Sequence, residues 1–436
     1  MKNILIIAYY FPPSGGPGVQ RVLKHVKYLP EFGYNPIVLT VENGQFPAKD
    51  ESLLKEIPDG IKVFRTKIFE PYDLYRMFTG KSKDTPVDVN VIHKDGAKLG
   101  IKESAAEFIR STFFIPDARI GWFFKAKRKA IDLVTTEKIS AVYTSSPPYT
   151  TALIGRHVKR NTGIPWIAGF RDPWTDFISS PNRWFLPKMI DKGMEKSVFK
   201  EANYIEAAWV GIIKDALKKY PHLNPDKFIH IPNGFDSADF APIDSPINNK
   251  FTLTYTGSMY GRRNPAALFE AIDKLIHQGK ITENDFKIKF IGRFGDEVLN
   301  MISSSTFNNS LEVIKYMSHG DSIIELQKSD LLLLVVDESK ESKEIVPGKV
   351  YEYMGIRKPI LVIAPEDGAI AKLIIETKSG LIAHQTDIEK IASNLLAFYQ
   401  KWVDKQELYS PDVNEISKYE RKNASKELSI LFNQTI

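Results

Sequence analysis

Short apolar runs alternate with amphipathic helical stretches along most of the chain, and this alternation constrains the fold more than any other feature. Ile4–Tyr10 is typical of a buried parallel strand, because it is a continuous apolar run closed by proline and glycine. The helical stretch Val19–Leu29 follows it, and the apolar run Pro36–Val41 comes next. Further strand candidates in this series are Ala141–Thr144, Trp166–Phe170 and Tyr204–Ala208. The pattern predicts a mostly parallel sheet with helices on both faces.

A second series of the same kind begins after Ile231–Gly234 and a polar stretch that runs to Lys250. Its strand candidates are Leu253–Thr256, Lys287–Ile291, Leu331–Val336 and Pro359–Ile363. The chain has 436 residues, enough for two or three domains. The predicted fold class is therefore α/β, with two Rossmann-like doubly wound domains. Ligands bind at the carboxyl ends of such strands, so we expect the two edges to face each other across a cleft.

Composition excludes several classes of protein. The chain has no cysteine, which removes disulfides, thiol nucleophiles and iron–sulfur clusters and favours a cytoplasmic location. A net charge of +6 over this length does not indicate a nucleic-acid binder. No apolar run approaches the ~18 residues that span a bilayer. The first apolar run is followed by Pro12–Pro13 rather than a small-residue cleavage site, so a buried strand is favoured over a secretory signal.

Charge is distributed unevenly along the chain. Residues 1–235 contain 35 Lys and Arg against 24 Asp and Glu, a net charge of +11. Residues 236–436 contain 24 against 29, a net charge of −5. The first half is therefore expected to meet an anionic partner.

Two motifs of the first half follow predicted strands. The stretch Pro12–Gly18 lies between the first strand and a helix, where glycines let backbone N–H groups approach a phosphate or a sugar. A tight turn that packs the helix on the strand is the alternative. Gly169–Trp174 follows the apolar stretch Ile164–Ala168, and its Arg171–Asp172 pair is suited to orient a hydroxyl or a phosphate. A structural ion pair is the alternative there.

Two further motifs lie in the second half. Thr256–Pro265 follows a predicted strand and contains Arg262 and Arg263, whose guanidinium groups suit phosphate oxygens, unless they are simply solvated. In Glu344–Glu352, seven residues separate two carboxylates. One is expected in the loop before a helix and the other one to two turns inside it, where a carboxylate can hold a ribose. Lys349 lies near that helix start and would add positive charge toward a diphosphate.

Together these residues resemble the family-4 retaining glycosyltransferases of GT-B fold, of the bacterial surface-polysaccharide type. The resemblance covers nearly the whole chain, through the motifs Tyr9–Pro13, Gly15–Gly18, Arg171–Trp174, Pro232–Asp236, Gly257–Ser258 and Glu344–Glu352. It implies that Glu352 binds the donor ribose and that Glu344 faces the donor sugar. It also implies a donor site formed by Gly16, Gly18, Gly257, Ser258, Arg263, Lys349 and Glu352, and acceptor contacts from Arg171, Asp172 and Trp174.

The chain departs from the family pattern at three places. Ser258 occupies the position of the usual Arg after the loop glycine, while Arg263 occupies that of the usual Lys. Ile345 replaces a glycine of the carboxylate loop. Arg171–Asp172 stands where many members place a His.

The implied reaction transfers a sugar from a nucleoside diphosphate sugar to a hydroxyl of a glycan or lipid-linked acceptor, with retention. Asp172, Glu344 and Arg263 are the predicted catalytic residues. The sequence contains no Asp-x-Asp, so no metal and no cofactor is expected, and the leaving phosphate would take the acceptor proton. Two alternatives stay open: a nucleotide-sugar epimerase of GT-B fold, and a non-catalytic nucleotide-sugar-binding protein.

The acceptor side is expected to include a membrane surface. Arg119–Lys129 contains five cations, no acid and three aromatic residues, which indicates a helix that lies on the anionic inner face of the cell membrane. Arg183–Met189 is a second such stretch, and an ordinary helix with a solvated basic face is the alternative for both.

The predicted domains are 1–235 for the acceptor, 236–410 for the donor, and 411–436 as a C-terminal helix that returns to the N-terminal domain. That helix is expected within Tyr419–Phe432. The polar stretch Phe69–Leu99 is interpreted as a surface insertion.

Overall fold

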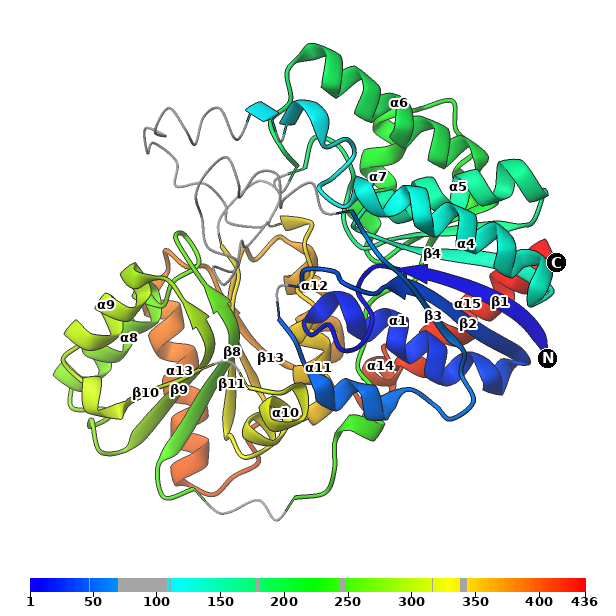
Figure 1. The fold of residues 1–436 in the computed structure, drawn as a ribbon. Helices are drawn as coiled ribbons and strands as arrows, with labels where there is room; N and C mark the ends of the chain where they lie inside the picture. Colours follow the sequence, from blue (N-terminus) through cyan, green and yellow to red (C-terminus); the bar gives the residue numbers. More distant parts are fainter. Residues whose placement is uncertain are drawn as a thin grey trace. The chain divides into compact units, whose positions relative to one another are not determined.

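The computed structural model of the chain describes residues 1–46, 48–69, 108–109, 111–177, 180–243, 248–315, 317–337 and 343–436. These residues form two compact units (Figure 1). The first contains Met1–Asn233 and Arg421–Ile436, and the second contains Gly234–Glu420. The predicted insertion 69–99 lies outside the described residues, apart from Phe69.

The first unit is built on a seven-stranded sheet whose order is β3-β2-β1-β4-β5-β6-β7. All neighbouring strands in it are parallel. The strands are β1 Lys2–Ala8, β2 Tyr34–Val41, β3 Val63–Thr66, β4 Ile139–Ser146, β5 Trp166–Phe170, β6 Tyr204–Ala207 and β7 Phe228–His230. The helices are α1 Pro17–Tyr28, α4 Phe123–Thr136, α5 Thr150–Thr162, α6 Phe185–Glu201, α7 Val210–Lys219 and α15 Arg421–Thr435.

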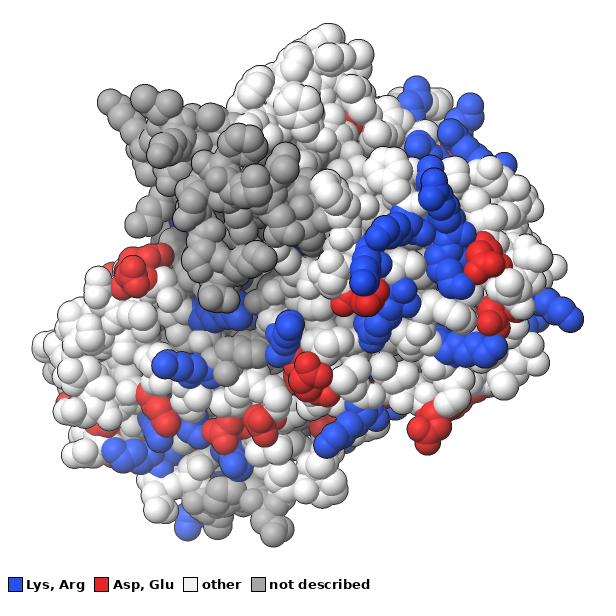
Figure 2. Space-filling model, in the orientation of Figure 1, with Lys and Arg blue, Asp and Glu red and all other residues white. Residues whose placement is uncertain are grey.

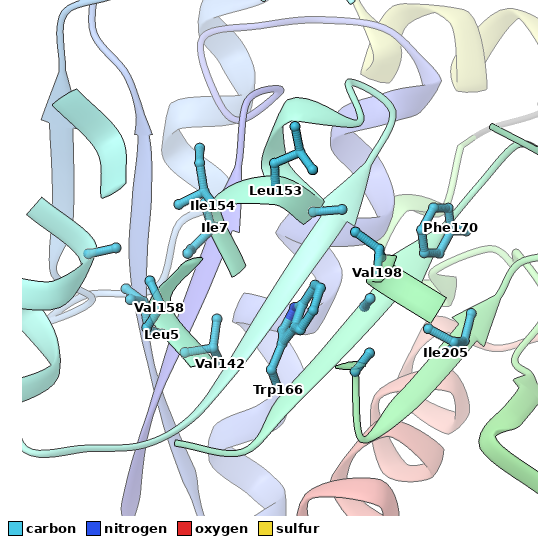
Figure 3. Close-up of a cluster of buried hydrophobic side chains, with 14 of the residues drawn as sticks. Leu5, Ile7, Val142, Leu153, Ile154, Val158, Trp166, Phe170, Val198 and Ile205 are labelled. Carbon is cyan, nitrogen blue, oxygen red and sulfur yellow. The ribbon is translucent and has the colours of Figure 1, made fainter. Parts of the chain in front are cut away.

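Helices cover both faces of this sheet, as the apolar strands require. Leu5 and Ile7 of β1 pack into one cluster with α4, α5, α6 and α7, part of which is drawn in Figure 3. Ile4 and Ile6 point to the other face, into a cluster with α1 and α15. Because successive residues of a strand point to opposite faces, a continuous apolar run fills both clusters.

The second unit contains a six-stranded parallel sheet with the order β10-β9-β8-β11-β12-β13. Its strands are β8 Phe251–Met259, β9 Phe286–Phe294, β10 Leu311–Lys315, β11 Leu331–Val335, β12 Ile360–Ile363 and β13 Gly380–Ala383. Its helices are α8 Ala266–His277, α9 Asp296–Ser304, α10 His319–Gln327, α11 Lys349–Ile356, α12 Ala369–Thr377, α13 Ile388–Val403 and α14 Val413–Ser417. One cluster joins the sheet to α8, α9 and α13, and the other joins it to α10, α11, α12 and α14.

These observations confirm the predicted fold class. Every predicted strand is present, with ends that differ by a few residues, and the last helix packs on the first unit. There His25 Nδ1 of α1 lies 3.0 Å from Ser425 Oγ of α15, and Tyr34 OH donates to Asn433 Oδ1 at 2.7 Å.

The division of the chain falls two residues before the predicted end of the first domain, because Phe235 packs in the core of the second unit. The stretch 411–420 also belongs to the second unit, where Phe235 N donates to the Tyr419 carbonyl at 3.0 Å. The returning segment therefore begins at Arg421.

Candidate functional sites

The glycine loop and Arg171 meet at the carboxyl edge of the first sheet. Gly16 is the N-cap of α1 and has φ +91°, a left-handed conformation that favours glycine. Gly18 lies against Arg171, which follows β5, because a Cβ on Gly18 would be 2.6 Å from Arg171 Nη1. Two motifs that are more than 150 residues apart in the sequence therefore form one loop cluster, at the edge where parallel sheets bind ligands.

Arg171 has no acidic partner among the described residues. Its Nη2 donates to the Pro147 carbonyl, and its guanidinium lies 5.9 Å from the centre of the Tyr10 ring. Its Nε is buried and makes no hydrogen bond. Arg171 and Asp172 form no ion pair in the described part of the chain. Burial raises the pKa of the Asp172 carboxyl, and the nearby charge of Arg171 partly offsets this rise. A half-buried guanidinium without a carboxylate favours an anionic ligand.

Trp174 does not have the surface position that acceptor contact requires. Only 2% of the residue is exposed, and its ring stacks on Tyr149 at 4.8 Å between centroids. Its Nε1 donates to Asp191 Oδ1 at 2.8 Å, and Arg183 Nε lies 2.9 Å from Asp191 Oδ2. Trp174 therefore anchors the loop that carries Arg171 and Asp172, which corrects the prediction for this residue.

The basic stretch 119–129 is only partly a surface. Arg119 is buried against the ring of Tyr9, 5.2 Å from its centre, and Trp122 Nε1 donates to Thr66 Oγ1 at 2.8 Å. Lys125 and Arg128 are exposed. Figure 2 shows Lys and Arg side chains gathered over the part of the first unit where α4 lies. The membrane prediction therefore applies to α4 itself, and Arg119 is removed from it.

The second predicted basic stretch is also divided by burial. Arg183 is buried in its ion pair with Asp191. Trp184, Phe185 and Met189, at the start of α6, are exposed.

In the second unit, Gly257 and Lys349 lie in contact at the carboxyl end of β8. Gly257 has φ +113°, and a Cβ there would be 2.7 Å from Lys349 Nζ. Lys349 Nζ donates to the Thr256 carbonyl at 2.5 Å and lies 4.0 Å from the centre of the Tyr255 ring. Burial, together with the charge of Arg263, lowers the pKa of Lys349 to about 7. Lys349, the first residue of α11, is thus half-buried against the Gly257 loop, for which the sequence predicted phosphate binding.

Arg263 and Ser258 lie on the same edge of the second sheet. Arg263 Nη2 is 3.6 Å from Asp337 Oδ1, just after β11, and its side chain is 39% exposed. Ser258 is exposed, and its carbonyl accepts a hydrogen bond from Tyr255 OH at 2.9 Å. Asp337 is a residue that sequence reasoning missed, because one acid after a strand gives no pattern.

The two carboxylates of the Glu344–Glu352 motif have different environments. Glu344 is exposed in the segment before α11, whereas Glu352 lies in the first turn of α11, slightly earlier in the helix than expected. His319 Nε2, at the start of α10, is 3.0 Å from Glu352 Oε1. Tyr353 OH accepts a hydrogen bond from Thr256 N at 3.0 Å, which ties α11 to β8. His319 was also missed, because it follows the unpredicted strand β10.

Within the described residues, no group of three or more His, Cys, Asp or Glu side chains is placed so that it could hold a metal ion. None of the described helices is long and apolar enough to cross a membrane.

Comparisons with known proteins fit this geometry. Residues 239–421, almost the whole second unit, match the family model of glycosyl transferases group 1. No curated protein sequence matches the chain significantly.

Solved structures resemble the whole chain. HepE (Alr3699) of Anabaena, in complex with UDP, has a TM-score of 0.62 at 11% identity, with 100% of each chain covered. TarM of S. aureus has a TM-score of 0.62 at 10% identity, covering 99% of this chain and 100% of its own. WaaG, a glycosyltransferase involved in lipopolysaccharide biosynthesis, has a TM-score of 0.54 at 13% identity, covering 99% and 98%. The chain thus has the GT-B fold, and its second unit carries a group 1 glycosyltransferase domain.

Proposed function

We propose that the protein is a retaining glycosyltransferase, which moves a sugar from a nucleoside diphosphate sugar to a hydroxyl of a glycan or lipid-linked acceptor. The observation that carries the proposal is the group of side chains at the carboxyl edge of the second sheet. Arg263, Lys349 and Glu352 come together there, within the matched domain. HepE, which has the same fold, has been solved with UDP and glucose.

In this proposal the second unit binds the donor. Arg263, Lys349 and the N-terminus of α11 stabilise the negative charge that grows on the leaving diphosphate. Glu352 accepts hydrogen bonds from the ribose hydroxyls, and Glu344 lies on the side of the donor sugar. Gly257 and Ser258 bring backbone close to the phosphates.

The first unit binds the acceptor and contributes Gly16 and Gly18 to the donor. Arg171 takes an anionic group, which agrees with its lack of an ion pair among the described residues. Asp172 orients the acceptor hydroxyl. The new bond joins the acceptor oxygen to the anomeric carbon on the face from which the diphosphate leaves, and a phosphate oxygen takes the hydroxyl proton.

We further propose a role in cell-surface polysaccharide or glycoconjugate synthesis at the cytoplasmic face of the membrane. The exposed cations of α4 support binding to anionic lipid there.

The reaction is proposed to need no metal ion and no cofactor, because the sequence contains no Asp-x-Asp. Undiminished transfer in a metal chelator is the expected result.

The test begins with thermal shifts measured with uridine, guanosine and deoxythymidine diphosphates and their sugars, since a bound ligand stabilises the fold by mass action. Transfer and donor hydrolysis are then measured for Glu352→Ala and Arg263→Ala. Each variant is expected to lose about a hundredfold or more in rate, because each removes a charged contact to the donor. Near-normal rates in both variants contradict the assignment. Conversion of the donor without an acceptor would instead indicate an epimerase, and binding without turnover a non-catalytic protein.

A further inference from the structure

A histidine outside every predicted motif holds the carboxylate assigned to the donor ribose. His319 Nε2 and Glu352 Oε1 are 3.0 Å apart, and the two side chains are 19% and 24% exposed. An ionised carboxylate only accepts hydrogen bonds, so the imidazole Nε2–H is the donor. The pair is accessible enough to meet a ligand and close enough to fix one carboxylate oxygen.

The two side chains lie on helices that are themselves fixed. Ile323 of α10 and Val350 of α11 belong to one buried cluster. The N-terminus of α10 is capped by Ser318, whose Oγ accepts a hydrogen bond from Asp321 N at 3.2 Å. Because both helices are anchored, the hydrogen bond from His319 holds the Glu352 carboxylate in one orientation.

We propose that His319 is a positioning residue, which orients Glu352 to accept hydrogen bonds from the vicinal hydroxyls of the donor ribose. This inference rests on the proposed function. A carboxylate has about four acceptor sites, and the bond from His319 occupies one of them. Without the hydrogen bond from His319, the Glu352 side chain is less ordered in the free protein. Ordering it when the ribose binds then costs free energy and weakens binding.

The ribose itself supplies the test. Dissociation constants of uridine and guanosine diphosphates and of their 2′-deoxy forms are measured by calorimetry on the full chain. The wild-type protein is expected to prefer the ribonucleotide about tenfold or more. In His319→Ala this preference falls severalfold toward one, while the affinity for the deoxy form changes little. His319→Gln, whose amide N–H can donate to Glu352, retains most of the preference.

His277→Ala is the matched control, because His277 lies at the end of α8 and its Nδ1 is 2.7 Å from the Asp273 carbonyl of the same helix. It is expected to leave all the dissociation constants unchanged. Combined with Glu352→Gln, His319→Ala is expected to add little further loss, since the two residues act through one contact.

Three outcomes overturn the inference. An unchanged preference in His319→Ala does so directly. An equal loss of affinity for both nucleotide forms indicates a structural role only. A wild-type protein that binds both forms equally well shows that the carboxylate does not read the ribose. If the wild-type protein binds no nucleoside diphosphate at all, the proposed function fails as well, and the two failures are thereby distinguished.

Discussion

The two units have the same architecture but use their charged residues differently. In the first unit the main ion pair, Arg21–Glu206, is inside the protein, with both side chains 1% exposed. Tyr143 OH donates to Glu206 Oε2 at 2.9 Å, and Arg21 Nη1 donates to the Pro232 carbonyl at 3.0 Å. In the second unit the charged groups at the strand ends stay partly in contact with solvent. The Arg21–Glu206 pair therefore supports the scaffold of the first unit, whereas the charged groups at the strand ends of the second unit are accessible to a ligand.

The largest expected effect is on the stability of the first unit. Arg21→Ala leaves the carboxylate of Glu206 buried without its partner, which costs about 3 to 5 kcal/mol. The partly exposed pair Arg263–Asp337, with 3.6 Å between Nη2 and Oδ1, is worth about 0 to 1 kcal/mol, so Arg263→Ala barely changes unfolding. Denaturant unfolding followed by circular dichroism measures both variants. Equal losses of stability would break the contrast between buried and exposed charge.

The two sheets also show which strands could be predicted from the sequence and which could not. The central strands were all predicted, since burial on both faces makes them continuous apolar runs. The four strands that were missed, β3, β7, β10 and β13, are the edge strands of the two sheets. None of the four residues of β3 is fully buried, and β10 carries Glu312 and Lys315. A half-exposed strand of this length has no periodicity that separates it from a loop.

The residues of the candidate sites were also only partly predictable from the sequence. The glycine loops and the Glu344–Glu352 motif were recognisable because their residue types are fixed at short spacing. Asp337 contacts Arg263, and His319 contacts Glu352. The partners in each pair are far apart in the sequence, so only the folded structure reveals them. Trp174 was misassigned, because an aromatic residue beside Arg171–Asp172 gives the same signal whether it meets a ligand or the core.

A smaller effect is expected when the two loop glycines are replaced. Gly257→Ala places a side chain at φ +113° and against Lys349 Nζ, so it is expected to cost about 1 to 3 kcal/mol and to weaken nucleotide binding. Gly18→Ala meets only the end of the Arg171 side chain, not backbone, and has no positive φ, so a stability loss below about 1 kcal/mol is expected. Thermal unfolding of both variants tests this. A larger loss for Gly18→Ala would reverse the comparison.

A pH effect of about tenfold per unit at most is expected in the second unit. The pKa of Lys349 is about 7, so the ammonium is lost as pH rises through neutrality. Binding of an anion favours the charged lysine and takes up a proton, so affinity for a nucleoside diphosphate falls as pH rises from 6 to 8. The free energy of unfolding has the opposite pH dependence. In the unfolded chain the lysine keeps its proton up to about pH 10.4, so this group makes the fold more stable as pH rises from about 7.

Lys349→Met is the control for titration of the ligand itself. Calorimetry at each pH is expected to show a flatter dependence in this variant than in the wild-type protein. An identical slope in both would show that Lys349 does not meet the diphosphate.

The smallest effect concerns the opposite charge of the two halves. If α4 lies on an anionic bilayer, each exposed cation contributes about 1 kcal/mol at low salt, so Lys125→Ser and Arg128→Ser each weaken binding about fivefold. Lys287→Ser, at a partly exposed lysine of β9 that is paired with Glu312, is the control in the acidic half and should have no effect. Co-sedimentation with phosphatidylserine vesicles measures all three variants, and raised salt should remove the differences because the attraction is screened. Equal binding to neutral vesicles, or equal loss in the Lys287 variant, would mean that the basic surface of α4 is solvated and the charge asymmetry serves another partner.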